Sequence, residues 1–142
     1  MKLKQIIAAY KALGEAKATS LEMKEIIKIV KARKAMRPYA EEFESFLKDV
    51  QEKFKPENWD EVQAKVQQWQ QEGDKTTLPQ SERTSINKVL MDYQKKIDSA
   101  VREELEREIE ITVEALTEDS ATKILVENGW EMRKLEEIEI IL

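Results

Sequence analysis

The chain has 142 residues, a length that fits one domain with a hydrophobic core of its own. It is 41% hydrophobic and 37% charged, and its 3 Gly and 3 Pro supply too few turns for an all-β fold of many short strands. Cysteine and histidine are both absent, which excludes disulfides, thiolate nucleophiles and sites built on cysteine or histidine ligands.

The net charge of −5 conceals a gradient along the chain. Residues 1–40 hold ten Lys and Arg but only three Glu, so the remaining residues carry a net charge of −12. An asymmetry of this size indicates association through complementary surfaces.

The N-terminal third predicts two helices. Apolar residues recur every three or four positions over residues 2–14, and Gly14 is a plausible end for this helix. Thr19 or Ser20 is expected to cap a second, long helix, because their hydroxyls can accept bonds from first-turn amides. That helix carries apolar positions from Leu21 to Phe54, among them Ile26, Ile27 and Val30. Pro38 should either kink this helix or split it in two.

The middle of the chain predicts two more helices. Asn58 is expected to cap a short helix whose apolar stripe includes Trp59 and Trp69. Residues 73–80 have the composition of an exposed loop, and Ser81 or Thr84 is expected to start a helix that reaches at least Leu105.

Residues 107–114 fit either a continued helix or a half-buried strand, since Ile109, Ile111 and Val113 alternate with polar residues. On a helix, Ile111 would face solvent, and β-branched residues cluster here, so we interpret the segment as a strand. Ile138, Ile140 and Leu142 alternate more weakly, which makes a two-stranded sheet conceivable. Between the two segments, a short helix is expected from a Thr117 cap to a Gly129 end, followed by another short segment from Trp130.

These patterns predict one mainly α domain, an elongated helical hairpin or bundle with a small two-stranded β element near the C-terminus. We expect it to comprise basic N-terminal helices (1–54), a variable helix and loop (55–80), and an acidic helix, strand and short C-terminal helices (81–142).

No arrangement of residues indicates catalysis. Acidic residues crowd positions 103–110, and two carboxylates could hold magnesium or divide acid and base roles. No phosphate-binding glycine loop, calcium motif or nucleophile motif accompanies them, so a solvated face is the simpler interpretation. Ser85 and Ser99 have no histidine to serve as a base. We expect no enzyme, no cofactor and no metal.

Two groups of residues form a candidate interaction surface. Basic residues cluster on the second helix and could contact either nucleic-acid phosphates or the acidic second half, within one chain or across a subunit boundary. The two tryptophans ten residues apart could anchor a partner, although burial in the core is the simpler account. The residues are Lys24, Lys28, Lys31, Arg33, Lys34, Arg37, Trp59 and Trp69.

Several segments resemble small proteins of unknown activity encoded by prophages and tailed bacteriophages. They are Met-Lys-Leu-Lys-Gln-Ile-Ile-Ala-Ala-Tyr-Lys-Ala-Leu at residues 1–13, Lys-Ala-Arg-Lys-Ala-Met-Arg-Pro-Tyr at 31–39, Glu-Ile-Glu-Ile at 108–111 and Leu-Thr-Glu-Asp at 116–119. The resemblance covers both ends of the chain, leaves out residues 55–80, and provides no catalytic residues. It implies an accessory or virion-assembly role.

The expected function is non-enzymatic binding to a second copy of the chain or to another phage or bacterial protein. The alternative is a nucleic-acid-binding accessory protein that uses the basic helix. The apolar run at residues 6–9 is too short for a signal peptide or a membrane span, so we expect a cytoplasmic protein in a bacterial host, with virion association as a further expectation and no membrane partner.

Overall fold

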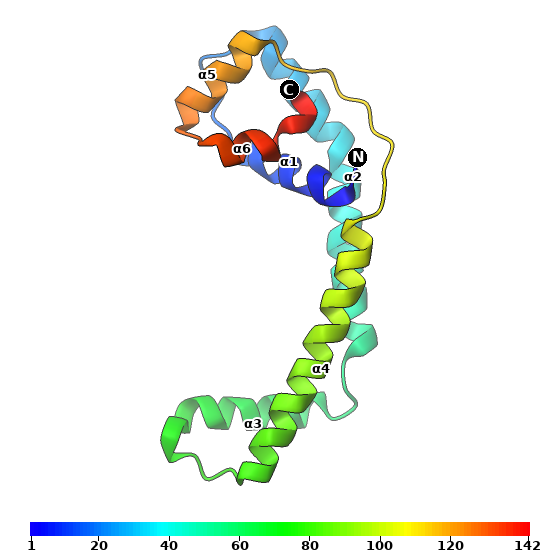
Figure 1. The fold of residues 1–142 in the computed structure, drawn as a ribbon, viewed down its shortest axis with the longest axis vertical. Coiled ribbons are helices and arrows are strands. Elements are labelled where there is room, and N and C mark those ends of the chain that lie inside the picture. Colours follow the sequence, from blue (N-terminus) through cyan, green and yellow to red (C-terminus); the bar gives the residue numbers. More distant parts are fainter. The chain divides into compact units, whose positions relative to one another are not determined.

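The computed structural model describes residues 1–142 and confirms that the protein is mainly α-helical (Figure 1). Six α-helices and two short 3-10 helices follow one another, and no strand forms. They are α1 (Leu3–Glu15), α2 (Met23–Phe54), α3 (Trp59–Glu72), η1 (Gly73–Lys75), α4 (Gln80–Leu105), α5 (Glu118–Asn128), α6 (Met132–Glu137) and η2 (Glu139–Ile141). The chain folds into two compact units, which we call unit 1 (Met1–Ser45 with Glu103–Leu142) and unit 2 (Phe46–Arg102).

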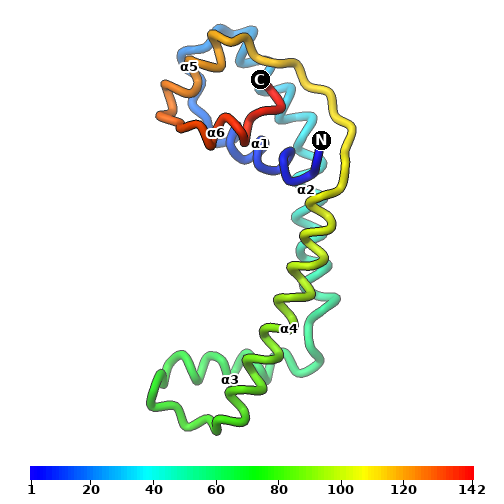
Figure 2. Tube along the Cα trace, in the orientation of Figure 1, coloured from blue at the N-terminus to red at the C-terminus, as the bar shows by residue number.

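Unit 1 contains both chain ends, as the trace in Figure 2 shows. Helix α1 packs against α6 and η2, and its apolar residues are buried at the helical spacing that the sequence predicts. Gly14 does not end this helix, which runs on to Glu15. The buried core consists of Leu3, Ile6, Ala9, Ala12, Leu13, Leu21, Ile29, Ala32, Met36, Ile109, Leu116, Ile124, Ile138 and Ile141. Full burial of each large aliphatic side chain contributes about 1.5–3 kcal/mol.

Helix α2 is one continuous helix of 32 residues with Pro38 inside it. Proline lacks the amide that would bond to the carbonyl four residues earlier. Both Lys34 and Pro38 are exposed, so water can satisfy that carbonyl, and the helix does not split. The predicted caps, Thr19 and Ser20, are wrong, because α2 begins only at Met23.

The hydroxyls of Thr19 and Ser20 bind a distant carboxylate instead. Glu127, near the end of α5, accepts hydrogen bonds from the Thr19 hydroxyl, from the Thr19 amide at 3.0 Å and from the Ser20 hydroxyl at 2.8 Å. The Asn128 side chain beside it exchanges two bonds of 2.7 Å with the backbone of Lys17. The end of α5 therefore fixes the loop between α1 and α2.

We expect Glu127→Gln to make unit 1 less sensitive to acid. The hydroxyls of Thr19 and Ser20 lower the pKa of Glu127 from 4.5 to about 2. A lowered pKa means that the stabilisation is complete above pH 4.5 and disappears as the pH falls through about 2. Circular dichroism melts at pH 7, 4 and 2 should show a steeper loss for the wild type than for the variant. Glu15→Gln, at an exposed position of unit 1 without a hydrogen bond or ion pair, is the matched control.

The predicted cap at Thr117 and helix end at Gly129 are both confirmed. The Thr117 hydroxyl accepts a bond from the Ser120 amide, and Gly129 adopts the left-handed conformation (φ 61°) that closes α5.

Both predicted strands are wrong. Residues 107–114 are extended, but they form only one isolated bridge, between Lys2 and Glu108. The C-terminal residues form the 3-10 helix η2. Ile138, immediately before that helix, and Ile141, its last residue, lie three residues apart, and both side chains reach the core.

Unit 2 contains the end of α2, then α3, η1 and α4. Its core is small: Val62, Leu78 and Ile86 are buried, with half-buried Val66, Trp69, Val89 and Leu90 packed against them. The predicted starts of α4 are wrong, because it begins at Gln80, and the Thr84 hydroxyl donates to the Gln80 carbonyl within its first turn.

Candidate functional site

Helix α2 carries an exposed apolar stripe in unit 1. Met23, Ile27 and Val30 are 69%, 44% and 59% exposed, and their spacings of four and three residues place them on one face of the helix. Ile29 and Met36 lie on the opposite face and are buried in the core. This part of α2 therefore has two apolar faces, of which only one is covered.

Exposed cations accompany the stripe. Lys34 follows Ile27 by seven residues and Val30 by four, so it lies on the same face. Lys31 and Arg37 are also exposed, and neither they nor Lys34 forms an ion pair. Lys24 is exposed and lies 3.4 Å from Glu22. We call Met23, Ile27 and Val30 with Lys24, Lys31, Lys34 and Arg37 the α2 surface.

Two predicted cations do not belong to the α2 surface. The Lys28 ammonium lies 2.8 Å from Oε1 of the buried Glu25 and 3.9 Å from Glu114. Its pKa is raised, mainly by Glu25. The guanidinium of Arg33 lies over the Tyr10 ring, 4.4 Å from its centroid. Both cations help to hold α2 in unit 1 and are not free for a ligand.

Trp59 and Trp69 lie in unit 2 and are half-buried. The ring centroids of Trp59 and Tyr93 lie 4.6 Å apart. The Tyr93 hydroxyl donates to the Gln51 carbonyl at 3.1 Å. Trp69 packs against the core and lines an open depression of about 340 Å³ between α3 and α4. The structure thus gives both tryptophans packing contacts inside unit 2.

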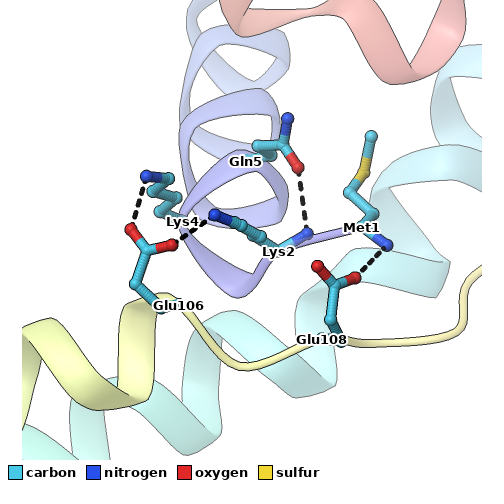
Figure 3. A network of polar contacts seen from close by, with 6 residues as sticks. All are labelled: Met1, Lys2, Lys4, Gln5, Glu106 and Glu108. Carbon is cyan, nitrogen blue, oxygen red and sulfur yellow. Dashed lines mark hydrogen bonds and ion pairs between the residues drawn. The ribbon is translucent and has the colours of Figure 1, made fainter.

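Two of the acidic residues at 103–110, Glu106 and Glu108, contact the N-terminal residues of the chain (Figure 3). The two carboxylate oxygens of Glu106 each lie 2.5 Å from an ammonium group, one from that of Lys2 and the other from that of Lys4. The N-terminal ammonium lies 3.0 Å from a carboxylate oxygen of Glu108. The two lysines lower the pKa of Glu106 to about 2. Part of the charge gradient is therefore neutralised within one chain.

Acidic residues also do not gather into a group of three or more that could hold a metal ion. None of the helices combines the length and apolarity needed to cross a membrane.

The apolar half of the α2 surface could have been found from the sequence. Ile26 and Ile27 are neighbours, as are Ile29 and Val30. Neighbouring helical residues point about 100° apart, so both members of a pair cannot face the same core. The structure buries Ile29 in the core and leaves Ile27 and Val30 exposed.

Comparisons of the chain with protein-family models, curated proteins and solved structures found no match.

Proposed function

We propose that this protein is a non-enzymatic accessory protein that associates with copies of itself through the α2 surface. The supporting observation is the set of three exposed apolar side chains, Met23, Ile27 and Val30, among four exposed cations, of which only Lys24 forms an ion pair. Protein interfaces commonly have an apolar centre and a polar rim. Covering the stripe would remove from water apolar area worth roughly 25 cal/mol per Å².

The complementary surface is present on the same chain. Val126 of α5 and Met132 of α6 are 76% and 77% exposed. Glu131 and Glu136, next to Met132 and one turn beyond it, are exposed and form no ion pair. We call these four residues the α5–α6 surface. It combines apolar groups with a net negative charge, because Glu131 and Glu136 outnumber the exposed Arg133 beside Met132. The α2 surface combines apolar groups with positive charge.

Contact between two different surfaces makes the association head-to-tail. Such a contact generates a closed ring or an open filament, depending on the rotation between copies. Two α2 surfaces facing each other would bring Lys31 and Lys34 against like charges, which disfavours a symmetric dimer through this face.

The resemblance to prophage and tailed-bacteriophage proteins supports an accessory role in virion assembly, in the cytoplasm of a bacterial host or on the virion. A self-associating protein without a reactive site suits that role. This part of the proposal rests on the sequence motifs at residues 1–13, 31–39, 108–111 and 116–119.

We expect the double variant Lys31→Glu/Lys34→Glu to weaken self-association about tenfold or more, because like charges would then face each other across the contact. Size-exclusion chromatography with light scattering, over a range of protein concentrations, measures the mass. Glu131→Lys/Glu136→Lys should weaken association similarly. The protein that carries all four changes should associate again.

Lys88→Glu/Lys95→Glu is the matched control, since it makes the same charge change at exposed positions on α4. A wild type that stays monomeric at every concentration, or a control that acts as strongly, contradicts the proposal.

The nucleic-acid alternative is an outcome of the same experiment. The four exposed cations of the α2 surface could contact phosphates, although the apolar side chains among them would then stay uncovered. A monomer that binds a labelled DNA duplex or RNA strand, loses this binding with salt and loses it in Lys31→Glu/Lys34→Glu would replace self-association with this function.

A further inference from the structure

The segment between α4 and α5 starts in β geometry. The Leu3 amide donates to the Arg107 carbonyl at 3.0 Å, and the Ile109 amide donates to the Met1 carbonyl at 2.8 Å. These two bonds flank the antiparallel bridge between Lys2 and Glu108. The backbone at residue 109 is therefore already aligned as a strand would be.

Beyond Ile109 this extended segment has no neighbouring backbone to pair with. The backbone of residues 110–115 makes no hydrogen bond within the protein until the Leu116 amide donates to the Ile141 carbonyl at 2.6 Å. Figure 1 shows this stretch, coloured yellow to orange, running as an open coil to α5. At about 3.3 Å per residue, it is as long as an average strand. We call residues 110–115 the open edge.

The side chains of the open edge alternate as in a half-buried strand. Ile111 and Val113 pack against the core of unit 1, beside buried Ile109. Glu110, Thr112 and Glu114 are exposed. The packed side chains hold the segment at one rotation, so its unpaired amides and carbonyls stay in a fixed register. An unpaired strand edge of this kind is a template for another strand.

We propose that an extended, basic segment of a partner protein adds to the open edge by strand pairing. This proposal rests on the proposed function, in that both assign protein binding to the chain, but it uses a different surface. Main-chain hydrogen bonds would provide affinity, and alternate side chains would provide specificity. Lys or Arg at every second position would face Glu110 and Glu114.

A second copy of the open edge does not fit as the partner. Antiparallel pairing centred on Thr112 would place Glu110 opposite Glu114 of the other copy, and parallel pairing in register would stack each glutamate on itself. Like charges directly opposite each other destabilise a strand pair. Charge complementarity therefore favours a basic partner strand.

We expect a short, fluorescein-labelled peptide of alternating lysine and valine to bind the full-length protein, measured by fluorescence anisotropy. Thr112→Pro removes an amide from the open edge at an exposed position without hydrogen bonds, and should weaken binding about tenfold. Thr112→Ala is the matched control and should bind like the wild type. Glu110→Lys/Glu114→Lys should transfer the preference to a peptide of alternating glutamate and valine.

Two further measurements separate strand pairing from attraction between charges. The lysine peptide with N-methyl groups on every amide keeps its charge but has no main-chain donor on either edge, and should not bind. Successive amides of a strand point to opposite edges, so hydrogen exchange should show new protection at the amides of Glu110, Thr112 and Glu114 when the unmodified peptide is bound. Equal binding by Thr112→Pro, binding of the methylated peptide, or no binding of the lysine peptide would overturn the proposal.

The two surfaces can fail independently. Lys31→Glu/Lys34→Glu should leave peptide binding unchanged, and Thr112→Pro should leave self-association unchanged. A wild type that binds the peptide but stays monomeric therefore rejects only the proposed function, and a wild type that self-associates but does not bind the peptide rejects only strand addition.

Discussion

Replacing Ile138 with Ala is expected to lower the free energy of unfolding by about 2–5 kcal/mol, the cost of removing a buried aliphatic side chain and leaving a cavity. Ile138 is 0% exposed and belongs to the core that joins η2 to α1. Urea unfolding followed by circular dichroism gives this value from the midpoint and the slope.

Leu142→Ala is the matched control for Ile138→Ala. Leu142 is 45% exposed at the end of the same segment. A loss within about 0.5 kcal/mol is expected there, as for most surface substitutions. A loss of unfolding free energy at Ile138 as small as that at Leu142 would show that Ile138 does not belong to the core.

Replacing Glu25 with Leu is expected to lower the melting temperature by several degrees. Glu25 is 1% exposed, and its Oε2 accepts the Thr117 amide at 3.0 Å, while Oε1 forms an ion pair with Lys28 that is not aligned as a hydrogen bond. Leucine would leave a cation and an amide without their acceptor in a place with little water, which costs more than the lost interaction. Thermal melts followed by circular dichroism measure the change.

Three variants define the role of Glu25. Glu22→Leu, on an exposed side chain nearby, should have little effect. Adding Lys28→Met to Glu25→Leu should recover part of the loss, because no unpaired cation remains. Lys28 and the Thr117 amide lower the pKa of Glu25, so its stabilisation is present above the ordinary pKa of 4.5 and declines only at lower pH. A Glu25→Leu protein as stable as the wild type would refute this account.

Local signals predicted local structure well. The Thr117 cap and the Gly129 end were found because each depends only on bonds within its own helix end. Thr19 and Ser20 have the same chemistry but were misassigned, because Glu127 binds both hydroxyls from more than a hundred residues away. No local pattern contains that pairing.

The errors at the two predicted strands have a different cause. Alternation at residues 109–113 correctly indicated an extended chain with one buried side, but a strand also requires a neighbour, which sequence periodicity does not reveal. At the C-terminus, Ile138 and Ile141 also fit the three-residue period of a 3-10 helix. In so short a segment, the spacing of apolar residues does not distinguish a strand from a 3-10 helix. For the candidate site, the cations of α2 were predicted from the sequence, whereas the exposure of Met23, Ile27 and Val30 beside them was not.

Unit 1 is assembled from the two ends of the chain, with all of unit 2 inserted between them. During synthesis, α1 and the first part of α2 emerge early but must wait for Ile138 and Ile141 before their core can close. Unit 2 has all its residues much sooner, and its contacts span shorter stretches of chain, which favours faster folding. We infer that the growing chain exposes the apolar face of α1 until Ile138 and Ile141 have been synthesised, so this face is where a chaperone would bind the nascent protein.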